Sequence, residues 1–332
     1  MTKWFAKVVF PCATLFLTCS AVYCDVITPE EPLDEESTPF KLEHILVTHG
    51  NKVQEIDVKT EKVTWQYVNL RGTRPIPIYS AQRLKGGHTL IVAALPDSLE
   101  NGVIEVDRNG TIVWERRDPD IFRQNLYYDA QRLKNRNTLI CGETFSGQYN
   151  WGKCWEYDMD PNSKTPVWSY QDFGAVRMTE GDRLEDSGNT LLSTAGYRGV
   201  IEIDPQNHVV WSYGVGLRED ATRIFAANDA DRLDKETTLI TGTFNTYEEP
   251  RPLVREIKST GEIVWEYTDL TVGLYSQGPE DADRLPDGTT IIADTGANRI
   301  ILVDQAGEIV WKYTTPDPPL DVDAIPPSGI IK

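Results

Sequence analysis

A short motif recurs through this chain and constrains its fold more than any other feature. Asp-Ala-Asp-Arg-Leu occurs at 229–233 and 281–285, and altered copies occupy 79–84, 128–133 and 180–184. Each copy precedes a turn, an apolar run and a final segment that contains a tryptophan. These tryptophans, 43 to 54 residues apart, are Trp65, Trp114, Trp168, Trp211, Trp265 and Trp311. A four-stranded unit of about 40–50 residues, repeated in this way, is typical of a β-propeller.

The last repeat shows how one unit is built. Residues 281–285 and 289–293 have the alternating, β-branched composition of two strands, and Pro-Asp-Gly at 286–288 is a turn signal between them. Residues 299–304 and 308–313 complete the unit as third and fourth strands. We expect the first strand to be innermost in the ring and the tryptophan of the fourth strand to fill the space between neighbouring blades.

The two ends of the chain complement each other. The first repeat has strand-like segments at 41–49, 52–57 and 62–67 but lacks the motif strand, whereas Asp321–Ile325 matches Asp281–Leu285 without a repeat of its own. The sequence therefore predicts an all-β, six-bladed β-propeller over residues 40–332, closed by a C-terminal strand that completes the first blade and hides its edge.

The first 39 residues have a different composition. Lys3 and Lys7 precede an apolar stretch at 8–17, and Cys19-Ser20-Ala21 is a small-residue cleavage site. Residues 1–24 are therefore interpreted as a signal peptide or, alternatively, as an uncleaved N-terminal membrane anchor. Residues 25–39 are interpreted as an acidic linker. Both alternatives predict an exported protein: secreted, periplasmic or anchored at the cell surface.

Charge limits the partners. The formal net charge of −18 disfavours nucleic acid and anionic membrane surfaces, because both attract basic proteins. Membrane contact is expected only through an uncleaved N-terminal segment, and the protein is expected to be a monomer. A small molecule or a protein on the loop face remains as the expected partner.

Two cysteines lie within the propeller repeats, Cys141 and Cys154, on the expected second and third strands of the third repeat. Their positions are nearly symmetric about the hairpin loop between them, which brings them opposite each other. In an exported protein they either form a disulfide or remain as two free buried thiols.

Carboxylates begin most of the inner strands and should gather near the axis. They are Asp129, Glu180, Asp229, Asp281 and Asp321. Oxygen ligands of this kind suit a hard cation such as Ca²⁺, so Asp129, Asp229, Asp281 and Asp321 are candidate metal ligands. The alternative is that the carboxylates cap backbone amides or pair with the arginines of the motif. No cofactor is required by the sequence.

The loops between second and third strands carry other polar residues. His49 ends the second strand of the first blade and is the candidate catalytic residue. Asn228, Arg198, Arg251 and Arg299 are candidate ligand-binding residues on the same face. An imidazole beside guanidinium groups has the chemistry to bind and transfer an anionic group such as sulfate.

The repeat Asp-Ala-x-Arg-Leu-x-x-Gly-x-Thr-Leu-Ile, followed by Gly-x-Ile-Val-Trp-x-Tyr, resembles the arylsulfotransferase family of propellers over roughly residues 41–331. It is more distantly similar to quinoprotein-type propellers. The resemblance implies a histidine that accepts sulfate from aryl sulfates and passes it to phenols. That histidine commonly precedes the inner-strand carboxylate, where this chain has Tyr79, Tyr128, Thr179, Asn228, Glu280 and Leu320.

Two functions remain open on these grounds. One is a propeller that binds a ligand or partner on its loop face without the family's usual catalytic histidine. The other is an active aryl sulfate sulfotransferase that uses His49.

Overall fold

The computed structural model describes residues 42–95, 101–117, 125–146, 149–196, 199–214, 224–245, 250–272 and 278–325. The expected signal or anchor at 1–24, the linker at 25–39 and Arg198 lie outside them. Phe40–Lys332 forms one compact unit. No helix in the described part of the chain is long and apolar enough to span a membrane. Its regular structure consists of β-strands and one short 3-10 helix, η1 (Thr295–Ala297).

Four sheets have four antiparallel strands each. The first contains β26 (Pro319–Ile325), β1 (His44–His49), β2 (Lys52–Asp57) and β3 (Lys62–Val68). The second contains β6 (Ile78–Arg83), β7 (Thr89–Ala94), β8 (Asn101–Val106) and β9 (Ile112–Arg117). The third contains β10 (Asn125–Arg132), β11 (Thr138–Ser146), β12 (Tyr149–Tyr157) and β13 (Trp168–Asp172). The fourth contains β22 (Asp281–Arg284), β23 (Thr290–Asp294), β24 (Arg299–Val303) and β25 (Ile309–Thr314).

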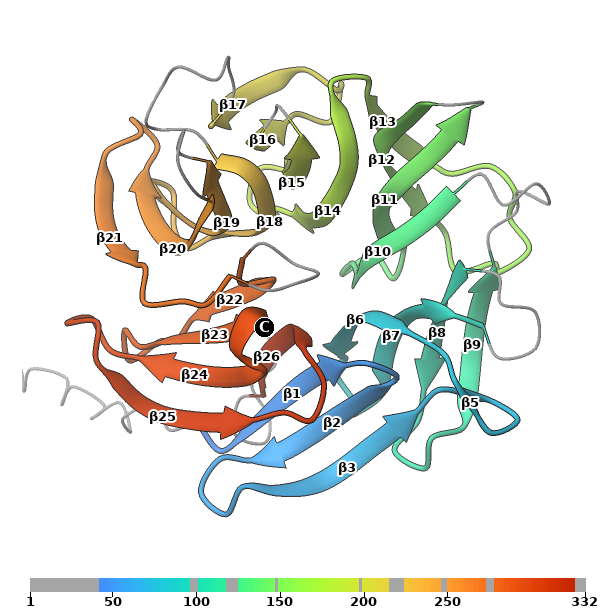
Figure 1. Cartoon of the computed structure of the whole chain (residues 1–332). Helices are drawn as coiled ribbons and strands as arrows, with labels where there is room; N and C mark the ends of the chain where they lie inside the picture. The colour runs from blue at the N-terminus through green and yellow to red at the C-terminus, as the bar shows by residue number, and fades with distance from the viewer. Residues whose placement is uncertain are drawn as a thin grey trace, which may run out of the picture. The chain divides into compact units, whose positions relative to one another are not determined.

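A fifth sheet has eight strands. Its strands are β14 (Ala175–Arg183), β15 (Thr190–Gly196), β16 (Val200–Ile203), β17 (Val209–Tyr213), β18 (Ile224–Arg232), β19 (Thr237–Asn245), β20 (Pro250–Lys258) and β21 (Ile263–Tyr267). A small ribbon of β4 (Leu70–Arg71) and β5 (Arg74–Pro75) stands apart. The sheets are arranged radially around a central axis, with β6, β10, β14, β18, β22 and β26 nearest to it (Figure 1). This is an all-β propeller arrangement.

The number of separate sheets differs from the sequence prediction. The sequence predicts six four-stranded sheets, whereas the structure has four of these and one of eight strands. The eight-stranded sheet arises because β15 and β18 are joined by a single pairing, between Ala195 and Ala226. Ala195 is the second-last residue of β15, and Ala226 is the third residue of β18, so the pairing joins only the ends of the two strands.

The C-terminal strand β26 lies beside β1 in an antiparallel register that pairs Val47 with Val322. Both side chains are fully buried, together with Ile45 and the neighbouring Ile291 and Ile300 of the fourth sheet. The C-terminal segment therefore contributes to an apolar core between two sheets, as well as to the hydrogen bonding of one.

The hairpin of β11 and β12 contains a disulfide. Cys141 and Cys154 are directly paired across the two strands, and a bond joins them with their Cα atoms 4.2 Å apart. Both residues are fully buried against Ala175 and Met178 of β14. Of the two states that the sequence left open, the structure has the disulfide.

A repeated contact, which we call the Trp–Arg–Glu clamp, joins neighbouring repeats. In each case the inner-strand arginine of one repeat lies over the tryptophan ring of the preceding repeat and pairs with a glutamate there. The five clamps are Trp65–Arg83–Glu55, Trp114–Arg132–Glu105, Trp168–Arg183–Glu156, Trp211–Arg232–Glu202 and Trp265–Arg284–Glu256. The arginines of the motif are thus used between repeats rather than at the axis.

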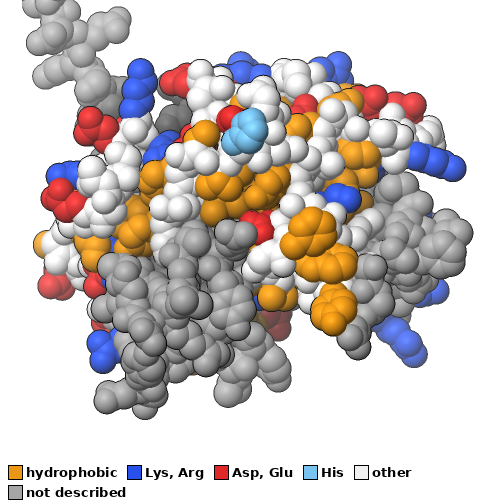
Figure 2. Space-filling view, turned by 90° about the horizontal axis from the view of Figure 1, so that it is seen from above, with side chains coloured by type: hydrophobic (Ala, Val, Ile, Leu, Met, Phe, Trp, Pro, Cys, Tyr) orange, Lys and Arg blue, Asp and Glu red, His pale blue; other side chains and the backbone are white. Residues whose placement is uncertain are grey.

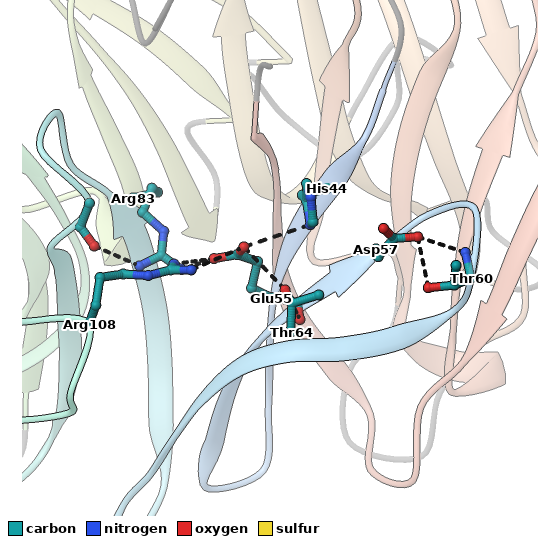
Figure 3. A network of polar contacts seen from close by, with 8 residues as sticks. His44, Glu55, Asp57, Thr60, Thr64, Arg83 and Arg108 are labelled. Atoms are coloured by element: carbon teal, nitrogen blue, oxygen red, sulfur yellow. Dashed lines mark hydrogen bonds and ion pairs between the residues drawn. The ribbon is translucent and has the colours of Figure 1, made fainter. Parts of the chain in front are cut away.

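The first clamp illustrates the chemistry, and Figure 3 shows its polar contacts around Glu55. Arg83 lies 4.5 Å from the centroid of the Trp65 ring. Its Nη2 is 2.7 Å from Glu55 Oε2. Arg108 binds the same carboxylate, and Thr64 donates to it over 3.1 Å. Burial alone would raise the pKa of Glu55, but the hydrogen bond from Arg108 and the charge of Arg83 lower it. Burial also lowers the pKa of Arg83 to about 10.

Candidate functional site

The inner-strand carboxylates form a ring of hydrogen bonds around the axis. Each accepts a bond from a backbone N–H of the next inner strand. The five pairs are Asp321 with Ala81 (2.5 Å), Asp129 with Gly181 (3.3 Å), Glu180 with Ala230 (2.9 Å), Asp229 with Ala282 (3.1 Å) and Asp281 with Val322 (2.6 Å). An innermost strand has no sheet neighbour on its axial side, so its N–H groups need such a partner. Capping of backbone amides, one of the alternatives from sequence, is therefore what these carboxylates do.

Burial strongly affects the protonation of this ring. It raises the pKa of Asp129 to about 6 and that of Asp321 to about 7. Burial, reinforced by neighbouring carboxylates, raises the pKa of Glu180, Asp229 and Asp281 well above their ordinary values. The axis is therefore a region where negative charge is costly unless a proton or a cation is held there.

Three of the axial carboxylates come close together. Glu180 on β14 and Asp229 and Asp231 on β18 each offer an oxygen, and these oxygens lie within 4.8 Å of one another. Asp229 is 3% exposed; its Oδ2 caps Ala282, whereas its Oδ1 is buried and accepts no hydrogen bond from a donor in the described part of the chain. Of the four metal ligands predicted from sequence, the structure brings only Asp229 into this group.

His49, the predicted catalytic residue, is fully buried in the first sheet. Its Nε2 is 2.8 Å from Gln54 Oε1, and its Nδ1 lies 3.5 Å from Asp317 Oδ2. The ring therefore has no solvent-exposed edge to present to a sulfate donor in this structure.

The other predicted ligand-binding residues that the structure describes have separate local surroundings. Asn228 is buried and donates to the carbonyl of Pro279 over 2.9 Å. Arg299 is 2.6 Å from the buried Asp294 of its own sheet. Arg251 is exposed on β20, and Arg198 lies outside the described residues. Asn228 and Arg299 thus stabilise the local backbone and side chains, and the anion site predicted from sequence is not assembled from them.

Hydrophobic side chains gather in groups on the outer side of the ring (Figure 2). Three aromatic side chains contact one another at the loop end of the disulfide-linked hairpin, and we call them the hairpin aromatic surface: Tyr149, Trp151 and Phe173. The Tyr149 and Trp151 rings are stacked with centroids 6.3 Å apart, and Phe173 meets Trp151 edge-on at 5.4 Å. Phe173 is 73% exposed and Tyr149 is 59% exposed. Exposed apolar rings that touch one another form a contiguous patch, which is a candidate contact surface.

A polar network lies beside this surface, between the third sheet and β14. Tyr128 donates to Glu143 over 2.6 Å, and Asn150 donates to the other oxygen of Glu143, also over 2.6 Å. The Arg177 guanidinium lies 5.4 Å from the Tyr128 ring centroid. Tyr79 meets Tyr128 edge-on, at a centroid distance of 5.9 Å. Burial and the hydrogen bond to Glu143 raise the pKa of Tyr128, so this tyrosine remains a neutral hydrogen-bond donor.

Sequence reasoning missed both features, although signals were present. Tyr79 and Tyr128 occupy the position before the inner-strand carboxylate, where the resemblance implies a histidine. The hairpin 138–157 is longer than its counterparts in the first two sheets, and it has Tyr149 and Trp151 at its end. An aromatic pair at the tip of a long hairpin is a signal for a surface contact, because core positions lie further down the strands.

Comparisons with known proteins give the fold but no function. No protein-family model and no curated protein matches the chain. Among solved structures, a protein of unknown function from Bacteroides caccae is 17% identical, with a TM-score of 0.61 over 85% of this chain and 98% of that one. A streptogramin B lyase is 14% identical over 84% of both chains, with a TM-score of 0.48. The β-propeller domain of Swd1 from Myceliophteria thermophila is 12% identical over 83% of both, with a TM-score of 0.47. None of these names an arylsulfotransferase, so that resemblance stays a prediction.

Proposed function

We propose that this chain is an exported six-bladed propeller whose ring closes between β26 and β1. The eight-stranded sheet counts as two blades, because one residue pair alone joins β15 to β18. Closure is supported by contacts between the last and first repeats: Trp311 Nε1 donates to Val58 O over 3.1 Å. Export is supported by the disulfide, since such bonds persist in oxidising compartments.

The function that the geometry supports best is binding of a protein partner at the hairpin aromatic surface, without catalysis by this chain. The single observation that carries the proposal is the exposure of Tyr149 and Phe173 around Trp151, on a hairpin that a disulfide fixes. Large rigid rings of this kind contribute much contact area at low conformational cost, and they are enriched at binding surfaces.

The chemistry of the partner follows from spacing and charge. The ring centroids are 6.3 Å apart for Tyr149 and Trp151 and 5.4 Å apart for Trp151 and Phe173. A row of three rings at these distances has the length of several residues of an extended polypeptide and is longer than a small ring-shaped ligand. The net charge of −18 draws cationic segments toward the protein. We therefore expect the partner to present an exposed segment that combines apolar side chains with lysine or arginine.

The test is a selection of random twelve-residue peptides against the purified protein, followed by fluorescence anisotropy of the enriched peptides. We expect enriched peptides to combine aromatic or aliphatic residues with a positive net charge. Tyr149→Ser with Phe173→Ser should weaken their binding at least tenfold. Val310→Ser is the matched control, because Val310 is 54% exposed on β25, far along the chain from the hairpin.

Three outcomes would overturn the proposal: the selection enriches no sequence, the enriched peptides carry net negative charge, or the double variant binds them as tightly as the original protein. Circular dichroism of each variant shows whether the fold is intact. Sulfotransfer through His49 is not favoured, because that imidazole is buried and already has Gln54 and Asp317 beside it.

A further inference from the structure

We propose that Glu180, Asp229 and Asp231 bind a hard divalent cation, of the Ca²⁺ class, beside the axis of the propeller. The two strands involved, β14 and β18, are the inner strands of neighbouring repeats. The site is separate from the hairpin aromatic surface and does not depend on the function proposed for it.

The geometry of the three carboxylates is the first argument. One oxygen from each lies within 4.8 Å of the others, a spacing that a single ion with ligand distances of about 2.3–2.6 Å can bridge. The backbone N–H of Ala230 holds Glu180 Oε2 at 2.9 Å, and that of Ala282 holds Asp229 Oδ2 at 3.1 Å. These bonds fix two of the carboxylates before any ion arrives.

The unpartnered oxygen is the second and independent argument. Asp229 is 97% buried, and its Oδ1 has no hydrogen-bond partner among the described residues. A side-chain hydrogen bond joins Asp229 to Glu180 when one of the two carboxyl groups holds a proton. Without that proton the buried oxygen has lost its hydration and gained no partner, which is costly, and a cation beside Asp229 would supply the missing interaction.

The charges around the three carboxylates also favour a bound cation. The nearest arginines of the motif are already engaged between repeats: Arg183 Nη2 is 3.0 Å from Glu156, and Arg232 Nη2 is 2.6 Å from Glu202. The charges that act on Glu180 are those of Asp231, Asp129 and Asp281, and those that act on Asp229 are those of Glu180 and Asp231. These neighbours disfavour bare negative charge on the cluster and favour a bound cation.

The donor set indicates the class of metal. The cluster offers carboxylate oxygens and no imidazole or thiolate, which are the ligands that zinc and copper prefer. Ca²⁺ accepts an irregular oxygen set completed by water, whereas Mg²⁺ requires a stricter octahedron. We therefore expect Ca²⁺ to bind more tightly than Mg²⁺ and both to bind more tightly than Na⁺.

The experiment is isothermal titration of Ca²⁺ into the full-length protein after removal of metals with a chelator, with the melting temperature measured in parallel. We expect one site and a melting temperature that rises with Ca²⁺. Asp231→Asn should weaken the affinity at least tenfold. Asp283→Asn, the equivalent position in the next repeat, is the control and should change the affinity less than threefold.

A crystal soaked in Mn²⁺ locates the ion independently through its anomalous signal, which should appear within coordination distance of Asp229 Oδ1. The proposal is overturned if millimolar Ca²⁺ gives neither heat nor a change in melting temperature, since a shared proton then neutralises the cluster. It is also overturned if Asp231→Asn binds Ca²⁺ as the unaltered protein does, or if the anomalous signal lies elsewhere.

Discussion

At the scale of single residues, the motif arginine has a more specific role than its position suggests. Its guanidinium lies between a tryptophan face and a buried glutamate, so that it is paired electrostatically and packed at once. The sequence contains all three partners in recurring positions: the motif arginine, the tryptophan of the fourth strand and a glutamate on the third. The recurrence of these residues can be read from the sequence. The pairing of an arginine with the tryptophan and glutamate of the preceding repeat cannot, because it depends on how the repeats pack against one another.

Breaking one clamp should destabilise the domain. In Arg232→Met, the carboxylate of Glu202 loses its partner at 2.6 Å while both side chains are largely buried. We expect a loss of about 2–4 kcal/mol in the free energy of unfolding, measured with urea. Lys258→Met removes the exposed pair with Glu262 and should cost under about 0.5 kcal/mol. Equal losses in the two variants would contradict this role of the clamp.

Protonation of Asp321 gives a pH dependence with a definite sign. Burial raises its pKa from 3.8 to about 7 in the folded protein, where Asp129, Asp281 and Thr48 surround it. The folded state therefore binds the proton more tightly than the unfolded state does. The resulting stability is fully present below pH about 4 and is lost as the pH rises toward 7.

We accordingly expect the free energy of unfolding, measured with chelator present, to decline between pH 5 and 7. Asp321→Asn should reduce that slope, because the amide oxygen can still accept from Ala81 but does not titrate. Unchanged slopes in the variant would show that other groups determine the pH dependence.

At the scale of elements, the strands could be predicted from the sequence, whereas the contacts of the candidate site residues could not. Period-two alternation and turn signals such as Pro286-Asp287-Gly288 place the strands of the last repeat within a few residues, and Gly288 has the positive φ of +86° that the turn requires. The burial of His49 could not be predicted for a physical reason: strand periodicity does not reveal that the imidazole contacts Gln54 inside the sheet. Likewise, Asp229 and Asp231 share a face of β18, but only the fold brings Glu180 beside them.

The C-terminal strand should be necessary for a stable domain. Deleting residues 319–332 removes β26, with its pairing to β1 and the fully buried Val322. We expect a loss of several kcal/mol, seen as a large fall in the melting temperature. Deleting only 327–332 is the control, because these residues lie beyond the strand. A melting temperature unaffected by the longer deletion would contradict the role of β26.

The disulfide should stabilise the hairpin that presents the aromatic surface. Cys141→Ala with Cys154→Ala removes a bond that spans a sequence separation of 13 residues. The expected cost is about 2–3 kcal/mol in unfolding free energy. Reductant should lower the stability of the original protein to a similar degree and leave the double variant unchanged. A response of the variant to reductant, or no response of the original protein, would contradict the bond.

At the scale of the whole molecule, the propeller separates its functions by distance from the axis. The axial carboxylates hold neighbouring inner strands together, and the clamps join neighbouring repeats further out. The exposed aromatic rings lie at the tip of the β11–β12 hairpin and, for Phe173, in the adjacent connection after β13. The resemblance to sulfotransferase propellers came from the repeats, which specify the scaffold. The residues that would specify chemistry depart from that pattern, so fold and function have to be argued separately.

The central claim is that this propeller binds a partner and does not transfer sulfate. The most direct measurement is turnover of an aryl sulfate donor with a phenol acceptor by the purified full-length protein, beside His49→Ala and Phe173→Ser. The account predicts no turnover above the uncatalysed rate in any of the three, and for His49→Ala only a lower melting temperature, because a fully buried side chain is lost. Turnover by the original protein that His49→Ala abolishes while its fold remains intact would contradict the account.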